Sequence, residues 1–356
     1  DGERLEASFK TFCARFPVLW GAPARCWCLA PYWRTPPAPD FCQPVRIGRS
    51  SLPADASRQT VVRHIETLTN RHAARLRWTA AFDSVRVGNT HCVLVFSFDH
   101  RLFDAAGGEA FINLFLRQTN GRADATEFPP PHPTASAELD RWKEKFTSGQ
   151  KVNRMMRSLA RGDTCWLPLP PDAIHRPFRF RVECFTPEEA QRIRERAFAV
   201  AGYLMLTPYL LATAAAVFRP VFRAQAAGPC NFVVSVSTAR TRTQAPRRRL
   251  FFNDLSFLYF QFPIEAATDR DTLAVSLREQ LIRQGREGIP AAIEDGNLLM
   301  RILPARWYWR FLMRFYRNRL SSFGFTGLGT SAITEPAVLG CPVRDRIHFP
   351  IIPTPP

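Results

Sequence analysis

The segment from Val93 to Gly108 constrains the fold of this 356-residue chain more than any other stretch. It opens with an apolar run that predicts a buried β-strand. His100 follows that strand, Asp104 comes four residues later, and helical periodicity begins after Gly107. A histidine held at the end of a rigid strand, at the start of a turn, is well placed to act as a general base on a molecule bound in a cleft.

The length of the chain exceeds what a single hydrophobic core usually supports, so two domains are expected. Strands and helices are mixed in both halves, which predicts an α/β (α+β) fold with an N-terminal lobe at 1–165, a linker at 166–174 and a C-terminal lobe at 175–356. Residues 31–57, rich in Pro, Ser and small residues, are expected to form a loop. The pattern predicts helices near 5–16, 57–72, 108–118, 136–160, 187–200, 208–219, 271–286 and 298–319, and strands near 75–81, 84–87, 92–98, 177–185, 231–237 and 255–262.

The formal net charge of +17 favours an acidic partner: nucleic acid, anionic lipid or an acidic carrier protein. Only four of the 48 basic residues are lysine, a bias that genome composition can also produce. The sequence shows no zinc-finger spacing, no recognition helix and no Gly-rich phosphate loop, so nucleic acid is the least favoured of the three partners.

The nine cysteines form no disulfide framework, and Cys26 and Cys28 lack a second pair at metal-binding spacing. The odd count indicates reduced thiols, and therefore the cytoplasm. No metal site and no signal peptide are predicted. Both chain ends look cut, so targeting elements can lie outside this sequence.

The stretch from Ala197 to Phe218 carries no charged residue and is long enough to span a bilayer. Gly202 and Pro208 interrupt it, however, and Thr207-Pro208 is a good helix start with Thr as the N-cap. We therefore expect two helices here, the second of them buried in the core, in preference to a membrane span.

The segment His100-Arg-Leu-Phe-Asp104 matches an HxxxD motif, and here the chain resembles the chloramphenicol-acetyltransferase-like superfamily. That group includes nonribosomal peptide condensation domains and wax ester synthase/diacylglycerol acyltransferases. Three further segments resemble family landmarks and occur in the family's order: Phe16-Pro-Val-Leu19, Asn253-Asp-Leu-Ser256 and Ser321-Ser-Phe-Gly324.

The chain also departs from the family's patterns. Asp99 stands where the family often has a first histidine, Ala105 stands where a glycine often follows the aspartate, and Phe252 replaces the glycine before Asn253. These changes leave the proposed base in place and weaken the assignment to one branch of the family.

The resemblance implies two lobes with an active-site channel between them, and acyl transfer from a thioester on CoA or a carrier protein. No cofactor is implied, because the acyl-CoA or phosphopantetheine-bound donor is a substrate. His100 is expected to be the general base, in direct transfer without an acyl-enzyme. The alternative from the residues alone is a structural histidine at a strand end. In the family the Asp104 position is structural and pairs with an arginine, for which Arg240 is the candidate and Arg242 is also possible.

The tetrahedral intermediate needs a hydrogen-bond donor for its oxyanion, and the resemblance offers Asn253, Ser321 and Ser322 as candidates. Gly107 and Gly108 are expected to bring backbone N–H groups close to a substrate phosphate or carbonyl, or simply to form a turn. The remaining histidines are treated as surface or packing residues: His64, His72, His91, His132, His175 and His348.

Four arginines form one stripe of a predicted helix that is otherwise rich in aromatic residues: Arg306, Arg310, Arg314 and Arg317. Such a helix can lie on an anionic membrane surface or meet an acidic carrier protein. The alternative is a core helix with a solvated arginine face.

The sequence therefore predicts an acyltransferase that moves an acyl group from a thioester to a hydroxyl or amine acceptor, in the cytoplasm or at the inner face of the membrane. The alternatives are an amide-forming condensation domain of the nonribosomal peptide type and a non-catalytic module that docks a carrier protein.

Overall fold

The structure is a computed structural model that describes residues 2–24, 32–35, 45–73, 78–122, 142–168, 177–239, 250–252, 255–300, 304, 307, 310, 321–327 and 329–349. The helices are α1 (Gly2–Ala14), α2 (Arg58–Ala73), α3 (Ala105–Thr119), α4 (Trp142–Ala160), α5 (Pro187–Ala201), α6 (Leu206–Arg223), α7 (Arg270–Arg286) and α8 (Ile289–Met300). The strands are β1 (Ala22–Ala24), β2 (Tyr32–Arg34), β3 (Val45–Leu52), β4 (Ala80–Val87), β5 (His91–Phe98), β6 (Asn231–Ala239), β7 (Leu255–Pro263), β8 (Phe323–Phe325), β9 (Ala337–Val338) and β10 (Cys341–Pro342). Short 3₁₀ turns occur at Pro17–Trp20 and Ile264–Thr268.

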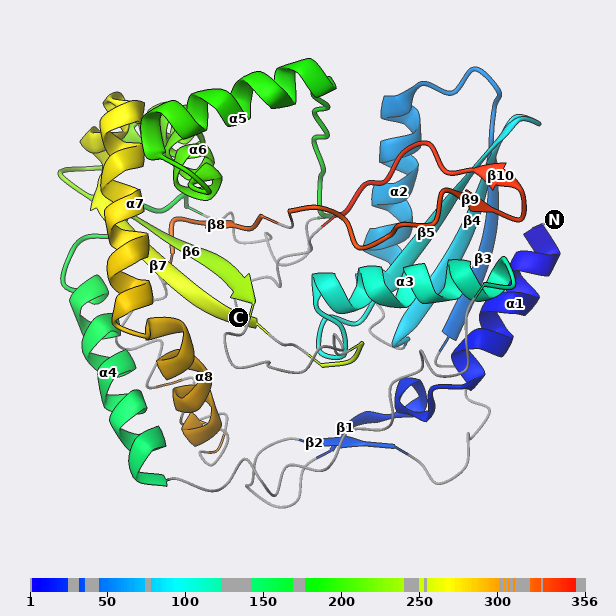
Figure 1. Cartoon of the computed structure of the whole chain (residues 1–356), viewed down its shortest axis with the longest axis horizontal. Coiled ribbons are helices and arrows are strands. Elements are labelled where there is room, and N and C mark those ends of the chain that lie inside the picture. The colour runs from blue at the N-terminus through cyan, green and yellow to red at the C-terminus, as the bar shows by residue number, and fades with distance from the viewer. Residues whose placement is uncertain are drawn as a thin grey trace.

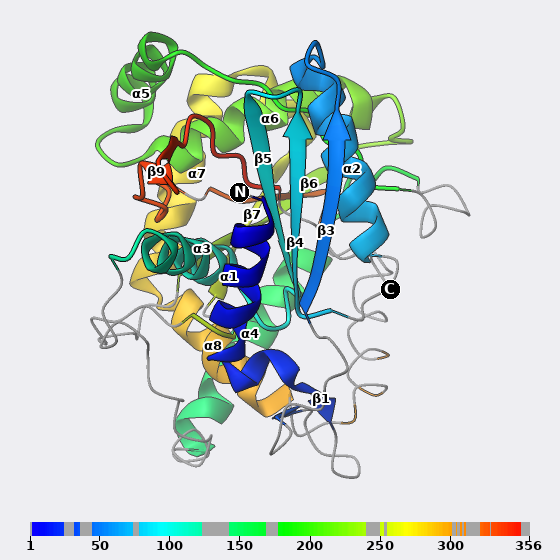
Figure 2. The same ribbon diagram turned by 90° about the vertical axis from the view of Figure 1, so that its right-hand side faces the viewer.

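The N-terminal lobe is built on a three-stranded sheet in the order β3-β4-β5, with β3 parallel and β5 antiparallel to β4. Helix α2 crosses from β3 to β4 and covers one face, while α1 and α3 cover the other (Figures 1 and 2). Alternate residues of β4 serve the two faces, so Phe82 packs with α1 and α3 and Val85 packs with α2. Burial of β4 on both faces makes this sheet the rigid support of the strand that ends at His100.

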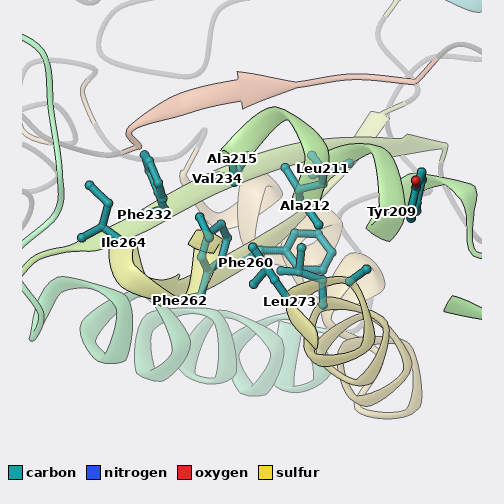
Figure 3. Close-up of a cluster of buried hydrophobic side chains, with 14 of the residues drawn as sticks. Tyr209, Leu211, Ala212, Ala215, Phe232, Val234, Phe260, Phe262, Ile264 and Leu273 are labelled. Carbon is teal, nitrogen blue, oxygen red and sulfur yellow. The ribbon is translucent and has the colours of Figure 1, made fainter. Parts of the chain in front are cut away.

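The C-terminal lobe has its own three-stranded sheet in the order β7-β6-β8. Strand β7 alternates buried and half-buried residues along its length. Its buried set packs with β6, α6 and α7 in the cluster that Figure 3 shows, around Phe232, Phe260 and Leu211. The many alanines of α6, among them Ala212 and Ala215, let this helix approach the sheet closely.

The chain crosses between the lobes at more places than the predicted linker at 166–174. Helix α4, which lies inside the predicted N-terminal lobe, packs against α8 of the C-terminal lobe. In the opposite direction, Leu250 and Phe251 join the core of the N-terminal lobe. The segment after β8 also returns to that lobe, where Asn120, the C-cap of α3, donates to the carbonyl of Ala337 at 2.7 Å. The two lobes are therefore tied together by exchanged segments.

Three predictions about single elements were wrong. Residues 45–52 form β3 instead of a loop, because a parallel edge strand needs little apolar sequence when only part of it is buried. The predicted strands at 75–81 and 84–87 correspond to one strand, β4, in the described residues. Residues 177–185 form no regular secondary structure, and side chains of α2 accept hydrogen bonds from their backbone: Asn70 from Phe178 and Glu66 from Phe180.

The paired helices of the uncharged stretch are present as α5 and α6, and they meet at an angle of 98°. No single described helix is long and apolar enough to cross a membrane, although this bent pair passes the length and composition test together. Helix α6 begins at Leu206 with Met205 as an N-cap that makes no side-chain bond. The prediction of a Thr207 N-cap was therefore wrong, and Thr207 lies in the first turn.

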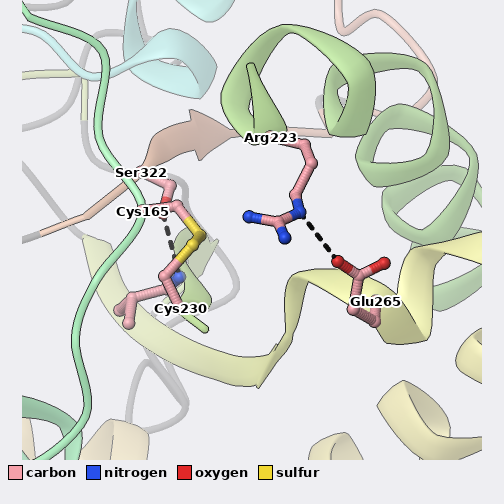
Figure 4. The surroundings of a disulfide bond; sticks show 6 residues. Cys165, Arg223, Cys230, Glu265 and Ser322 are labelled. Carbon is pink, nitrogen blue, oxygen red and sulfur yellow. Dashed lines mark hydrogen bonds and ion pairs between the residues drawn. A yellow bond between two sulfur atoms is a disulfide. The ribbon is translucent and has the colours of Figure 1, made fainter. Parts of the chain in front are cut away.

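The prediction that all nine cysteines are reduced was also wrong. Cys165 and Cys230 form a disulfide with a Cα–Cα distance of 5.4 Å. It joins the segment after α4 to the start of β6, beside Ser322 (Figure 4). Backbone bonds support the link, because the N–H of Cys165 donates to the carbonyl of Asn231 at 2.8 Å. Cys13, Cys92, Cys184 and Cys341 are free.

Candidate active site

His100 stands in a tight turn directly after β5. The turn is closed by the Asp99 carbonyl, which accepts hydrogen bonds from the N–H groups of Leu102 and Phe103 at 2.9 and 3.0 Å. The Nδ1 atom of His100 lies 2.8 Å from the carbonyl oxygen of Phe103. A carbonyl only accepts, so Nδ1 carries the proton in the neutral ring and Nε2 keeps its lone pair. The turn thus fixes the ring and presents a basic nitrogen.

The neighbouring Asp99, which replaces the family's first histidine, forms a local ion pair. Its buried carboxylate accepts from Nε of Arg101 at 3.0 Å and from Nη2 at 2.5 Å. These bonds raise the pKa of Arg101 above its ordinary value. The charge next to His100 is therefore neutralised within the turn itself.

Asp104 is the N-cap of α3 and is 7% exposed. One of its carboxylate oxygens accepts from the N–H of Gly107 at 2.7 Å. A carboxylate here also interacts favourably with the dipole of the helix. The structure therefore gives Asp104 a structural position at the base of the turn. Its predicted partner, Arg240, lies outside the described residues, so that ion pair stays a prediction.

The two glycines of the motif serve close packing. A Cβ atom on Gly107 would lie 2.6 Å from the carbonyl oxygen of Leu250, and one on Gly108 would lie 3.3 Å from the ring of Phe98. The N–H of Gly107 donates to the Asp104 side chain, and the N–H of Gly108 donates to the Asp104 carbonyl at 2.9 Å. Both N–H groups are thus engaged within the helix start, and their predicted role toward a substrate is not visible in this conformation.

A cavity of 3360 Å³ lies between the lobes and contains His100 in its wall. The N-terminal lobe contributes β5, the turn at 99–104 and Glu109 of α3. The C-terminal lobe contributes Thr207, Ser237 and Thr326, and the last two bond each other through their hydroxyls at 2.8 Å. The side chain of His100 is exposed toward this space. The N-terminal wall of the cavity therefore carries the His100 imidazole, and the C-terminal wall carries hydroxyl groups.

The structure does not bring every predicted site residue to this cavity. The N–H of Ser322 donates to the carbonyl of Val233 at 2.7 Å, and neither Ser321 nor Ser322 lines the cavity. Arg310 is exposed. The other predicted site residues lie outside the described residues: Arg240, Asn253, Arg306, Arg314 and Arg317.

His348, which the sequence predicts to be a surface or packing residue, is exposed. His348 lines the same cavity as His100. The surrounding protein lowers the pKa of His348 below its ordinary value, the nearby carboxylate of Glu109 opposes that effect, and His100 adds to it. No local pattern marks His348, because only the return of the C-terminal segment brings it here. Among the described residues, no group of three or more His, Cys, Asp or Glu could hold a metal ion.

No protein-family model matches the sequence, and no curated protein matches it. Solved structures do match. The cyclization-docking bidomain of the EpoB nonribosomal peptide synthetase from Sorangium cellulosum is 17% identical over 97% of this chain and 66% of its own, with a TM-score of 0.55. The first condensation domain of the calcium-dependent antibiotic synthetase is 15% identical over 92% of this chain and 72% of its own, with a TM-score of 0.54.

The tallysomycin biosynthesis protein TlmII is 15% identical over 92% of this chain and 74% of its own, with a TM-score of 0.51. A condensation domain of the enacyloxin polyketide synthase, with a TM-score of 0.45, is matched over 56% of its length. The chain thus spans between about half and three quarters of these proteins. It has the two-lobed α/β fold of condensation and cyclization domains, with an identity too low to show more than the fold.

Proposed function

We propose that this protein transfers an acyl group from a thioester to a hydroxyl or amine acceptor in the cavity between its lobes. One observation supports this most strongly: the 2.8 Å bond between Nδ1 of His100 and the Phe103 carbonyl places the lone pair of the neutral ring on Nε2, and the residue is exposed at the cavity. Imidazole is the side chain that most often serves as a general base toward an attacking hydroxyl or amine.

In the proposed reaction, Nε2 of His100 removes the proton of the acceptor as its oxygen or nitrogen bonds to the thioester carbonyl carbon. The tetrahedral intermediate then expels the thiolate, and the thiolate takes from the imidazolium the proton that the acceptor gave up. The products are an ester or amide and a free thiol, and no acyl-enzyme forms. Thr207, Ser237 and Thr326 are hydroxyl donors on the cavity wall that can bond the oxyanion. Asn253 remains the candidate offered by the sequence.

The donor is proposed to be acyl-CoA or an acyl group on the phosphopantetheine arm of an acidic carrier protein. Both present the same flexible thiol arm, and the net charge of +17 suits the negative charge of either carrier. Purified protein supplied with matched acyl-CoA and acyl-carrier-protein donors separates the two. A carrier-protein donor is supported if kcat/KM for the acyl-carrier-protein exceeds kcat/KM for the acyl-CoA and falls steeply with added salt.

Amide-forming condensation is a second candidate, because the solved structures that share the fold with TM-scores above 0.5 include a condensation domain. A panel of acyl-CoA and acyl-N-acetylcysteamine thioesters, each paired with 1-octanol or octylamine, separates the reactions by the mass of the product. An ester supports transfer to a hydroxyl, and an amide supports condensation. Tight binding of a carrier protein without any thiol release would instead support a non-catalytic docking module.

Association with an anionic membrane remains a proposal for the arginine stripe at 306–317. The described residues of this segment agree with an accessible surface, since Arg310 of the stripe is exposed and the neighbouring Trp307 is 70% exposed. Flotation with phosphatidylglycerol vesicles tests it. Failure to float at low salt would remove the membrane from the list of partners.

A further inference from the structure

The C-terminal segment carries a second histidine to the cavity that contains His100. After β8 the chain leaves the C-terminal lobe, passes along α3, forms the β9–β10 hairpin and turns back toward the space between the lobes (Figure 1). His348 lies near the end of this return path. It lines the cavity together with His100 and Glu109.

The backbone on either side of His348 is anchored. The ring of Phe349 packs at a tilt of 51° against Phe180 with a centroid distance of 4.5 Å, and it also packs on the cluster between α2 and the sheet. Before His348, the guanidinium of Arg346 donates to the carbonyl of Glu335 at 3.0 Å. The position of His348 relative to β5 is therefore set by packing on the same sheet that supports His100.

The ring of His348 is exposed toward the cavity, and no hydrogen bond to another described residue holds it. Its surroundings favour the neutral form, because enclosure by protein and the neighbouring His100 both lower its pKa and outweigh the opposing Glu109. Among the other charged residues of the cavity wall, Asp99 pairs with Arg101 and Asp345 lies 3.9 Å from Arg58. Arg344 and Arg346 line the cavity on the same segment as His348, and Arg346 bonds the Glu335 carbonyl. A neutral imidazole offers one donor and one acceptor to a bound molecule.

We propose that His348 is a specificity-determining residue that hydrogen-bonds the acceptor and orients its nucleophilic atom toward Nε2 of His100. The proposal rests on the proposed function, since it deepens the role of the same cavity. A neutral ring suits this task for a second reason: a positive charge on His348 would oppose the proton that His100 takes up. Orientation of a nucleophile toward its base is a large contributor to rate, so a modest hydrogen bond here has a measurable effect.

The test compares His348→Phe, which keeps a flat ring without hydrogen-bonding groups, with His348→Gln, which keeps a donor and an acceptor that do not titrate. His64→Gln is the matched control, because His64 lies on α2, bonds Ser50 of β3 at 2.8 Å and does not line the cavity. The probes are acyl-N-acetylcysteamine thioesters with 1-octanol or octylamine, and the readout is thiol release.

We expect His348→Phe to lower kcat/KM for the acceptor about tenfold, the effect of losing one good hydrogen bond, while KM for the donor stays unchanged. His348→Gln should retain most of the activity and change the ratio of alcohol to amine turnover. In the wild-type protein, kcat/KM for the acceptor should fall when His348 is protonated, at a pH below the ordinary range of a histidine because its pKa is lowered. This contribution to the pH profile should be absent in His348→Gln, because the glutamine side chain does not titrate.

His100→Ala separates failure of this inference from failure of the proposed function. If His100→Ala is inactive while both His348 variants match the wild type for both acceptors, the inference is wrong and the proposed function stands. If His100→Ala turns over like the wild type, the proposed function itself fails. Should His348→Phe not fold, as judged by circular dichroism, His348→Gln decides alone, and unchanged acceptor selectivity with an unchanged pH profile would overturn the inference.

Discussion

Replacing Asp104 with alanine should destabilise the protein and reduce its activity together. The side chain is 7% exposed and accepts the N–H of Gly107 at 2.7 Å at the first turn of α3. Loss of an N-cap of this kind costs about 0.5–2 kcal/mol. If Asp104 also pairs with Arg240, as the family resemblance implies, removal of the carboxylate leaves a buried guanidinium unpaired and the loss rises to about 3–5 kcal/mol.

Asp104→Asn distinguishes these two contributions, because an amide oxygen can still cap α3 but carries no charge. Urea unfolding followed by circular dichroism gives the free energy of unfolding for both variants and for Asp55→Ala, an exposed aspartate used as the control. We expect the free energy of unfolding to fall by about 3–5 kcal/mol in Asp104→Ala, and by a large share of that in Asp104→Asn. A loss below about 0.5 kcal/mol in Asp104→Ala, within the range of ordinary surface substitutions, would refute the reasoning.

Three further predictions concern packing, pH and the exchanged segment. Gly107→Ala should lower the free energy of unfolding by about 1–3 kcal/mol, because its Cβ would meet a backbone oxygen at 2.6 Å. Gly108→Ala should lower it less, because its Cβ would meet a ring atom at 3.3 Å. Equal melting temperatures of the two variants would contradict this. Arg49 lowers the pKa of the buried Glu6 from its ordinary 4.5, so the pair stabilises the fold above that pH and the stability is lost as the pH falls through the lowered value. Arg49→Met should therefore lose stability at pH 7 and show a weaker decrease toward pH 3 in urea titrations; parallel pH curves would disprove it. Asn120→Ala removes hydrogen bonds of 2.9, 2.7 and 3.1 Å to the segment before β10, which should lower the free energy of unfolding by about 2–3 kcal/mol and speed proteolysis of that segment. Unchanged proteolysis would contradict this prediction.

Local patterns predicted the elements whose signals are contained in a few neighbouring residues. The strand, turn and helix around His100 were expected, and β5, the turn and α3 are present. The start of α5 was also confirmed, since Thr186 and Glu189 form a reciprocal capping box with bonds of 3.2 and 2.8 Å. In both cases the chemistry that decides the structure lies within one or two turns of the chain.

Long-range packing determines the structural features that local sequence patterns did not predict. Strand β3 has the sequence Val-Arg-Ile-Gly-Arg-Ser-Ser-Leu, and its pairing with β4 makes it a strand although half of its residues are polar. The exchange of α4 and of the C-terminal segment between lobes depends on contacts such as Ser148 with Asp295 at 3.1 Å, which join distant parts of the chain. For the same reason, nothing near His348 in the sequence indicated that it lines the cavity.

The central claim is that Nε2 of His100 removes the acceptor's proton, and the rate of thiol release by His100→Ala tests it most directly. With a thioester and acceptor that the wild-type protein turns over, we predict that kcat/KM falls by about 10²–10⁴ in His100→Ala, the usual contribution of a general base, while the melting temperature changes little. A folded His100→Ala protein that releases thiol as fast as the wild type would contradict the account.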